Sequence, residues 1–217
     1  LCDRRQRQMC IRDSDRCAIV KKAKNKTLML REMIDSGKYN FCNSVVYCGQ
    51  GKDTDTDNRI IDIVTDYLYQ GGFKVTQFTS KTKFRTRVLT EFENGYFDTL
   101  IAIKCFDQGV DVPKLDKIYI LSSDTLMRQT IQRRGRVLRK CKETGKEIAY
   151  IYDMIAVPPH DITEGIGVKP LIAKEIKRIN EYARLSNNKR YSLDLIEELI
   201  NKYEITEDSD DEQETYN

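Results

Sequence analysis

One stretch of the chain, residues 128–139, carries the side chains with the clearest capacity for chemistry. Five of the twelve residues in its sequence, RQTIQRRGRVLR, are arginine. Arg136 and Arg139 are three positions apart, so on a helix their guanidinium groups lie on one side, about one turn from each other. Two forked donors that keep their charge match the oxygen atoms of a polyphosphate. A solvated basic helix without a specific ligand is the alternative. Three apolar residues predict that part of the stretch packs against protein: Ile131, Val137 and Leu138.

A second candidate lies in the acidic turn FDQGVDVP, residues 106–113. Gly109 permits a tight turn close to a ligand. Asp111 offers a carboxylate that can accept hydrogen bonds from a ribose hydroxyl, and Pro113 restricts the chain where it leaves the turn. By themselves these residues also fit an ordinary acidic turn.

The elements that would position both motifs follow from the apolar pattern. Short runs rich in β-branched and aromatic residues predict five buried strands, at residues 44–48, 74–79, 99–103, 117–121 and 148–152. Helical patterns between them predict an α/β fold with a parallel sheet covered on both faces. Ligands of such sheets bind beyond the carboxyl ends of the strands, where the acidic turn and the start of the basic helix both fall.

Apolar stripes at helical spacing predict the helices. One stripe is Ile60, Ile61, Ile63, Val64, Tyr67 and Leu68, with Asp57 as N-cap and Gly71-Gly72 as the end. A second is Phe84, Val88, Leu89 and Phe92. Residues 1–40 are predicted as a mostly helical lead-in that ends near Gly37, and residues 157–206 as a helical appendage. The appendage has two stripes, Ile172, Ile176, Ile179 and Ala183, then Ile196, Leu199, Ile200 and Tyr203.

Charge and composition bound the functional classes. The net charge is +3, but the predicted disordered tail, residues 207–217, holds six acids, which leaves +9 on the remainder. A basic body of this kind suits a protein that binds polyanions. The sequence has no run of 18 or more apolar residues, so no membrane span is predicted. It also lacks a starting Met and an apolar signal region, so we expect a piece of a longer protein.

The seven cysteines are scattered, none with C-x-x-C spacing, and His160 is the single histidine. This pattern argues against a zinc site or a disulfide framework and favours a reducing, cytoplasmic location with most cysteines as small apolar fillers.

Together the two motifs resemble the second half of superfamily 2 helicases. That family carries D-E-G-x-D-x-P and, about twenty residues later, Q-x-x-G-R-x-x-R. Residues 107–113, DQGVDVP, resemble the first motif with Gln108 in place of Glu, and residues 132–139, QRRGRVLR, match the second in full. The order of motifs is most similar to the XPB-like and restriction-enzyme-like DNA branch. The resemblance covers residues 41–156 and implies a RecA-like lobe.

The resemblance also implies roles. Arg136 and Arg139 would reach the triphosphate of ATP as arginine fingers, with Gln132 near the γ-phosphate. Gly109, Asp111 and Gly135 would line the nucleotide cleft, with Asp111 on the ribose. The phosphate loop and most Mg²⁺ contacts would belong to an N-terminal RecA-like lobe of the same protein.

The nucleic-acid contacts implied by the resemblance come from three loops. Thr79 and Ser80 follow one predicted strand. Lys104 and Cys105 follow another, at the place where the family usually has a Thr or Ser that contacts the nucleic-acid backbone. The loop of Gly49, Gln50 and Gly51 supplies further candidates for phosphate contact. DNA is the expected partner, the sequence leaves RNA open, and a nuclease or restriction partner is conceivable.

Two functions remain at this stage. One is the C-terminal motor lobe of an ATP-dependent DNA helicase or translocase, inactive by itself. The other is a binding or scaffold module that kept the lobe and holds nucleic acid through phosphate contacts alone. The complete spacing of Gln132, Gly135, Arg136 and Arg139 favours the motor, because a scaffold needs none of these residues at those positions.

Overall fold

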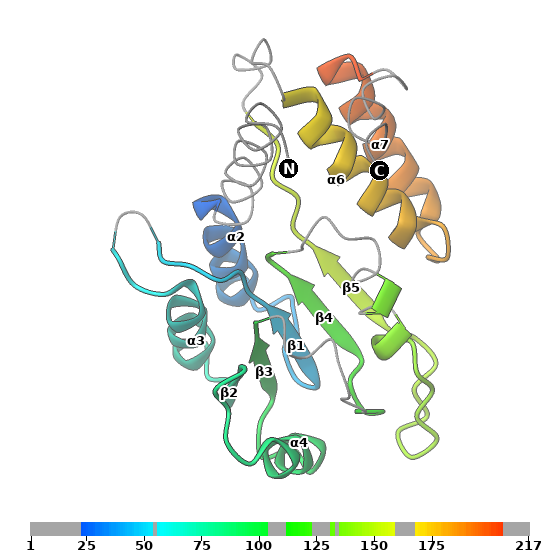
Figure 1. Cartoon of the computed structure of the whole chain (residues 1–217). Helices are drawn as coiled ribbons and strands as arrows, with labels where there is room; N and C mark the ends of the chain where they lie inside the picture. Colours follow the sequence, from blue (N-terminus) through cyan, green and yellow to red (C-terminus); the bar gives the residue numbers. More distant parts are fainter. Residues whose placement is uncertain are drawn as a thin grey trace, which may run out of the picture. The chain divides into compact units, whose positions relative to one another are not determined.

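The computed structural model contains a five-stranded parallel sheet (Figure 1). The structure describes residues 23–53, 56–103, 112–122, 131–132, 135–158 and 168–205. The strand order is β2-β3-β1-β4-β5. The strands are β1 (Ser44–Tyr47), β2 (Val75–Phe78), β3 (Thr99–Ala102), β4 (Lys117–Ile120) and β5 (Tyr150–Asp153). The predicted parallel α/β fold is therefore confirmed, and β5 begins two residues later than predicted.

The middle strand, β1, pairs with β3 on one side and with β4 on the other. Val45 lies opposite both Leu100 and Ile118, and none of the three has exposed surface. Every residue of β1 and β3 is buried, which explains why these strands are continuous apolar runs rather than alternating patterns.

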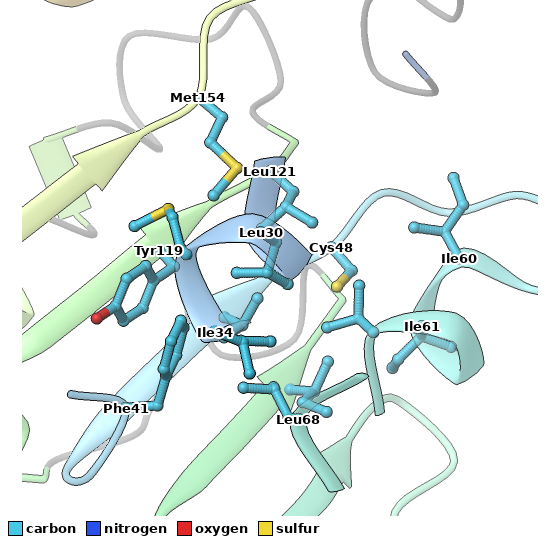
Figure 2. Packing of buried hydrophobic residues seen from close by; sticks show 14 residues of the cluster. Leu30, Ile34, Phe41, Cys48, Ile60, Ile61, Leu68, Tyr119, Leu121 and Met154 are labelled. Atoms are coloured by element: carbon cyan, nitrogen blue, oxygen red, sulfur yellow. The ribbon is translucent and has the colours of Figure 1, made fainter. Parts of the chain in front are cut away.

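Two helices cover one face of this sheet, α2 (Lys24–Asp35) and α3 (Ile60–Gln70). Leu30 and Ile34 of α2 meet Ile61 and Leu68 of α3 in a core cluster (Figure 2). From the sheet the same cluster takes Val46, Cys48, Ile101, Tyr119 and Leu121. Helix α2 stops where predicted, since Gly37 has a φ of 63°, a left-handed conformation that glycine adopts without strain.

The start of α3 differs from the prediction that Asp57 caps it. Arg59 occupies the N-cap position, and Asp57 has a φ of 55° outside the helix. The Asp57 carboxylate instead accepts a hydrogen bond from Lys52 Nζ at 2.6 Å, inside a loop closed by a bridge between Lys52 and Arg59. A local ion pair thus replaces the predicted cap.

Helix α4 (Arg85–Glu93) also departs from its predicted stripe. Phe92 is buried, Val88 and Leu89 are half-buried, and Phe84 is 79% exposed. Phe84 precedes the helix in a left-handed conformation, with φ 52° and ψ 45°. Its side chain therefore leaves the line of the helical stripe, and the prediction that Phe84 is a core residue is wrong.

Residues 155–205 belong to a second compact unit within the described chain, separate from residues 23–154. Its helices are α6 (Val168–Ala183) and α7 (Lys189–Tyr203). Six residues of the predicted stripes form one cluster: Ile172, Ile176, Ile179, Ile196, Leu199 and Tyr203. Ala183 is buried as well, whereas Ile200 is 37% exposed. The Tyr203 hydroxyl donates to the Pro158 carbonyl at 2.6 Å, and Glu175 forms a buried ion pair with Arg178 at 2.6 Å.

Three cysteines fall in the described part of the chain, Cys42, Cys48 and Cys141, and all three thiols are free. Cys48 is a member of the core cluster, and burial raises the pKa of its thiol far above its usual value. Within the described residues, no helix is long and apolar enough to cross a bilayer. The lead-in up to residue 22, residues 159–167 and the acidic tail lie outside the described residues.

The end of α3 makes the tightest glycine contact with the core. A Cβ at Gly71 would overlap Cγ2 of Ile34 on α2. We expect Gly71→Ala to destabilise the fold by about 1–3 kcal/mol through overpacking, measured by chemical denaturation. In an Ile34→Ala background the same substitution should lose most of its effect, because the obstructing methyl is gone. Equal losses in both backgrounds would contradict the proposed contact.

Candidate functional site

The carboxyl ends of the five strands meet at one edge of the sheet, because every pairing is parallel. Backbone hydrogen bonds continue the ladder one residue past the strands. The amide of Cys48 donates to the Ala102 carbonyl at 2.9 Å, and the amide of Leu121 donates to the Tyr47 carbonyl at 3.0 Å. The loops that leave β1 and β4 therefore start from fixed positions.

The basic stretch is helical at residues 131–132 and 135–137 and ends at Val137, which is fully buried. Arg139 lies two residues past the end, so the prediction that Arg136 and Arg139 share a helix is wrong for Arg139. The backbones of the two residues are joined by a turn instead, in which the Arg139 amide donates to the Arg136 carbonyl at 3.4 Å. Arg136 and Gln132 are half-buried, whereas Arg139 is exposed.

Val137 alone bears out the prediction that apolar residues of this stretch pack against protein. Ile131 is 47% exposed and Leu138 is 48% exposed. The buried Val137 fixes the helix on the lobe, while apolar surface beside the arginines stays open to solvent. The prediction that part of the stretch packs against protein is therefore confirmed, but sequence spacing alone did not tell which of the three apolar residues meets the core.

Gly135 has no packing reason to be glycine among the described residues. It lies in the helix, its φ is outside the left-handed region, and a Cβ built on it would meet no atom within 4 Å. Glycine inside a helix destabilises it by roughly 0.5–1 kcal/mol relative to alanine. A glycine here is therefore better explained by something that approaches the helix from outside.

A lysine in the hairpin after the basic stretch holds the segment that follows the acidic turn. Lys146 Nζ donates to the carbonyl of Pro113 at 3.3 Å and to that of Leu115. The hairpin itself is closed by an antiparallel bridge between Cys141 and Lys146. We call this contact of Lys146 with residues 113–115 the lysine clamp.

The lysine clamp works in a partly desolvated place. Burial lowers the pKa of Lys146, while the nearby carboxylate of Asp116 opposes that shift. On the other side of the same segment, Lys114 Nζ donates to the Glu93 carbonyl at the end of α4 at 3.0 Å. Residues 112–116 are thus tied to the hairpin that follows the basic stretch and also to α4.

Thr79 lies directly after β2 in a tight turn. Its amide donates to Thr82 Oγ1 at 2.7 Å, and its own hydroxyl oxygen accepts from the Lys81 amide at 3.2 Å. The next residue, Ser80, is exposed. The Ser80 side chain is therefore open to solvent, whereas the Thr79 hydroxyl oxygen already accepts one hydrogen bond within the turn.

Gln50 is exposed in the loop after β1, while its neighbour Gly49 is buried. The amide of Ile60 donates to the Gly51 carbonyl at 3.2 Å, which draws the start of α3 onto this loop. Strand β3 lies between β1 and β2 in the sheet, so the loops of Gln50 and of Thr79 leave from strands that are not adjacent.

Four predicted site residues, Lys104, Cys105, Gly109 and Asp111, lie outside the described residues. Their roles stay predictions. The described chain stops at Ile103, directly past the carboxyl end of β3, and resumes at Val112, five residues before β4 begins. Among the described residues, no group of three or more His, Cys, Asp or Glu could hold a metal ion.

The lysine clamp corresponds to none of the motifs predicted from the sequence. Lys146 stands in a polar hairpin with no motif around it, and its contact with residues 113–115 joins positions more than 30 apart in the chain.

A family model described as the helicase conserved C-terminal domain matches residues 21–141, which is more than half of the chain. The UvrABC system protein B of Lacticaseibacillus casei (strain BL23) is 36% identical over 104 residues, covering 45% of this chain and 15% of that protein. The protein of the same name from Enterococcus faecalis (strain ATCC 700802 / V583) is 34% identical over 104 residues, again 45% of this chain and 15% of that protein. The chain therefore spans only about 15% of the length of these relatives.

Two solved structures share the fold. The C-terminal domain of the DEAD-box protein Dbp5 has a TM-score of 0.53 at 15% identity, covering 82% of this chain and 93% of that one. The RNA-helicase Prp28 from Chaetomium thermophilum bound to ADP has a TM-score of 0.50 at 17% identity, covering 75% of this chain and 35% of that one. At such identities the likeness concerns the fold alone.

Removal of the lysine clamp should loosen residues 112–116 more than the rest of the lobe. Lys146→Met keeps the approximate length of the side chain but removes the two hydrogen bonds that Nζ donates. We therefore expect a loss of about 1–2 kcal/mol in unfolding free energy and faster amide exchange at residues 112–116. Lys146→Arg should recover most of both. Lys142→Met, at an exposed position of the same hairpin, is the matched control. Unchanged exchange at 112–116 in Lys146→Met would rule out the clamp.

A substitution at Gly135 should affect the stability and the function of the lobe in opposite directions. Because a Cβ there meets no atom of the described residues within 4 Å, Gly135→Ala should raise the unfolding free energy by about 0.5–1 kcal/mol in thermal or chemical denaturation. If the glycine serves an external ligand, the more stable variant should also be functionally weaker. A destabilised Gly135→Ala variant would show that the glycine serves the lobe's own packing.

Proposed function

This chain belongs to the helicase conserved C-terminal domain family of superfamily 2, and on that premise we propose that it is the second motor lobe of an ATP-dependent DNA helicase or translocase. The observation that carries the proposal is the complete motif of residues 132–139 placed after β4, with its helix anchored by Val137 and Arg139 open to solvent.

In this proposal Arg136 and Arg139 contact the triphosphate of ATP as arginine fingers. A guanidinium stays charged and donates in a fixed fork, which suits the charge that spreads over the oxygens of the transferred γ-phosphoryl group. Such contacts are worth roughly 10³–10⁵ in rate in other phosphohydrolases. Arg136 is half-buried against the lobe, and Arg139 lies at its exposed surface.

The remaining nucleotide contacts are assigned by the same resemblance. Gln132 donates near the γ-phosphate, Gly135 allows close approach, and Gly109 and Asp111 line the cleft with Asp111 on the ribose. These donors and the Asp111 carboxylate fit a nucleoside triphosphate. ATP and Mg²⁺ would be held mainly by a first RecA-like lobe, because this sequence has no G-x-x-x-x-G-K-[ST] spacing.

The nucleic-acid contacts in this proposal are phosphate contacts from the carboxyl edge, made by Thr79, Ser80, Lys104, Cys105 and Gln50. The exposure of Ser80 and Gln50 supports them. DNA is chosen because the order of motifs is most similar to the XPB-like and restriction-enzyme-like branch. Such contacts fix position without reading sequence.

The domain arrangement is part of the same proposal. Residues 41–156 form the RecA-like lobe, residues 1–40 lead into it, residues 157–206 form the helical appendage, and residues 207–217 form an acidic disordered tail. Closure of this lobe on the first lobe with ATP, and reopening after hydrolysis, would move the backbone contacts along one strand in the cytoplasm. A nuclease or restriction subunit would be a natural partner of such a motor.

A scaffold that binds nucleic acid without hydrolysis is the competing function. The charge of +9 outside the acidic tail favours it, since a basic surface alone binds polyanions. It gives no role to Gly135 or to the spacing of Arg136 and Arg139. Hydrolysis measurements separate the two functions.

Removal of the exposed arginine is the decisive test of the motor. In a protein that joins this chain to a phosphate-loop lobe, we expect Arg139→Ala to lower DNA-stimulated ATP hydrolysis by at least a hundredfold, while a fluorescent ATP analogue still binds. Lys140→Ala, which removes the exposed charge next to it, should keep near-normal turnover. The 217-residue chain by itself should not hydrolyse ATP.

Near-normal turnover in Arg139→Ala would reject the arginine-finger assignment. Equal losses in Arg139→Ala and Lys140→Ala would point to a general effect of positive charge on DNA binding, as the scaffold reading expects.

A further inference from the structure

The residue that starts α4 combines a strained backbone with an unpacked aromatic ring. Phe84 has φ 52° and ψ 45°, a conformation that bulky residues rarely adopt, and its side chain is 79% exposed. Its carbonyl accepts the first helical hydrogen bond, from the Val88 amide at 3.2 Å, so the helix holds this backbone geometry. Strain that packing does not offset points to a role outside the lobe's own stability.

The other phenylalanines near this turn are buried. Phe78 at the end of β2 and Phe92 near the end of α4 have essentially no exposed surface. The guanidinium of Arg85 covers the Phe78 ring, with its Cζ 4.7 Å from the ring centroid. The left-handed turn at Phe84 therefore keeps one aromatic ring out of a core that takes its neighbours.

Four exposed positive residues lie within three positions of Phe84 in the chain. Lys81, Lys83, Arg85 and Arg87 are all exposed, and no acidic residue lies in the first turn of α4. Arg87 is paired with Glu91 at 2.8 Å, whereas Lys81 and Lys83 have no ion-pair partner among the described residues. Positive side chains at the positive end of a helix are unfavourable unless an anion joins them.

An exposed ring beside the exposed lysines Lys81 and Lys83 matches a strand that offers both flat bases and phosphates. Duplex DNA keeps its bases stacked on one another and offers no free face, so the ring suits a single strand. We propose that Phe84 is a stacking platform for a base of single-stranded DNA, with Lys81 and Lys83 on the flanking phosphates. This rests on the proposed function and adds a base contact beside the phosphate candidates Thr79 and Ser80.

The test uses the absence of tryptophan from this sequence. Phe84→Trp makes the ring a unique fluorophore in the 217-residue chain. Saturating oligothymidylate should quench its fluorescence, because a stacked base quenches indole, and the same sequence as a duplex should not. Tyr96→Trp, at a 68% exposed position beyond the other end of α4, is the matched control and should stay unquenched.

A second variant separates stacking from stability. Phe84→Gly suits the left-handed backbone, so its thermal midpoint should be equal to or above that of the parent chain. Its affinity for a labelled oligothymidylate, measured by anisotropy, should nevertheless fall roughly five- to hundredfold, as expected for the loss of one stacked base. An abasic oligonucleotide should bind parent and variant alike.

The outcomes separate this proposal from the proposed function. If the parent chain binds single strands but Phe84→Trp is unquenched and Phe84→Gly binds equally well, the platform is wrong while the nucleic-acid partner stands. If the parent chain binds no oligonucleotide, the partner itself is wrong. Quenching by an acidic peptide in place of DNA would assign the platform to a protein.

Discussion

The parallel pairing of β1 with β3 on one side and β4 on the other decides where each loop of this lobe can go. Parallel strands need a crossover over a face of the sheet, and crossovers are almost always right-handed. The connection from β1 to β2 runs one way along the sheet and places α3 with α2. The later connections run the other way along the sheet, so the handedness assigns α4, between β2 and β3, to the opposite face. The connections that follow β1 and its two neighbours therefore leave the carboxyl edge in opposite directions. Sheets of this kind form their ligand crevice where that direction changes.

The strands were predictable from sequence because both faces of the sheet are covered. A residue such as Val45 or Val46 is buried whichever face it points to, so the central strands β1 and β3 are rich in apolar residues on both faces. Strand β2 at the edge is less buried and includes the polar residues Thr76 and Gln77. Local ends of helices were less predictable, since they depend on contacts far from the pattern. Asp57 has a capping residue's chemistry, yet its ion pair with Lys52 holds it outside α3. Phe84 has helical spacing, yet its left-handed backbone turns it away from the stripe.

The candidate site was predictable in its residue types and less so in its geometry. Spacing placed Arg136 and Arg139 one turn apart on a helix, whereas the helix ends at Val137 and a backbone hydrogen bond from the Arg139 amide to the Arg136 carbonyl forms the turn that follows. No pattern could show that Lys146 holds residues 113–115, because an isolated lysine in a polar hairpin has many equivalent neighbours in sequence. Its partners are backbone carbonyls, which every residue carries, and only the tertiary fold selects two of them.

The lysine clamp bears on how a motor lobe could transmit movement. It joins the segment after the acidic turn to the hairpin after the arginine pair, and Lys114 ties the same segment to the end of α4. The Phe84 platform stands at the start of that same helix, next to β2 at the outer edge of the sheet. Groups proposed for nucleotide and for DNA are thus attached to one packed body. A closure of the lobe would displace both together as a rigid body, and the coupling would need no separate chain of side-chain movements between them.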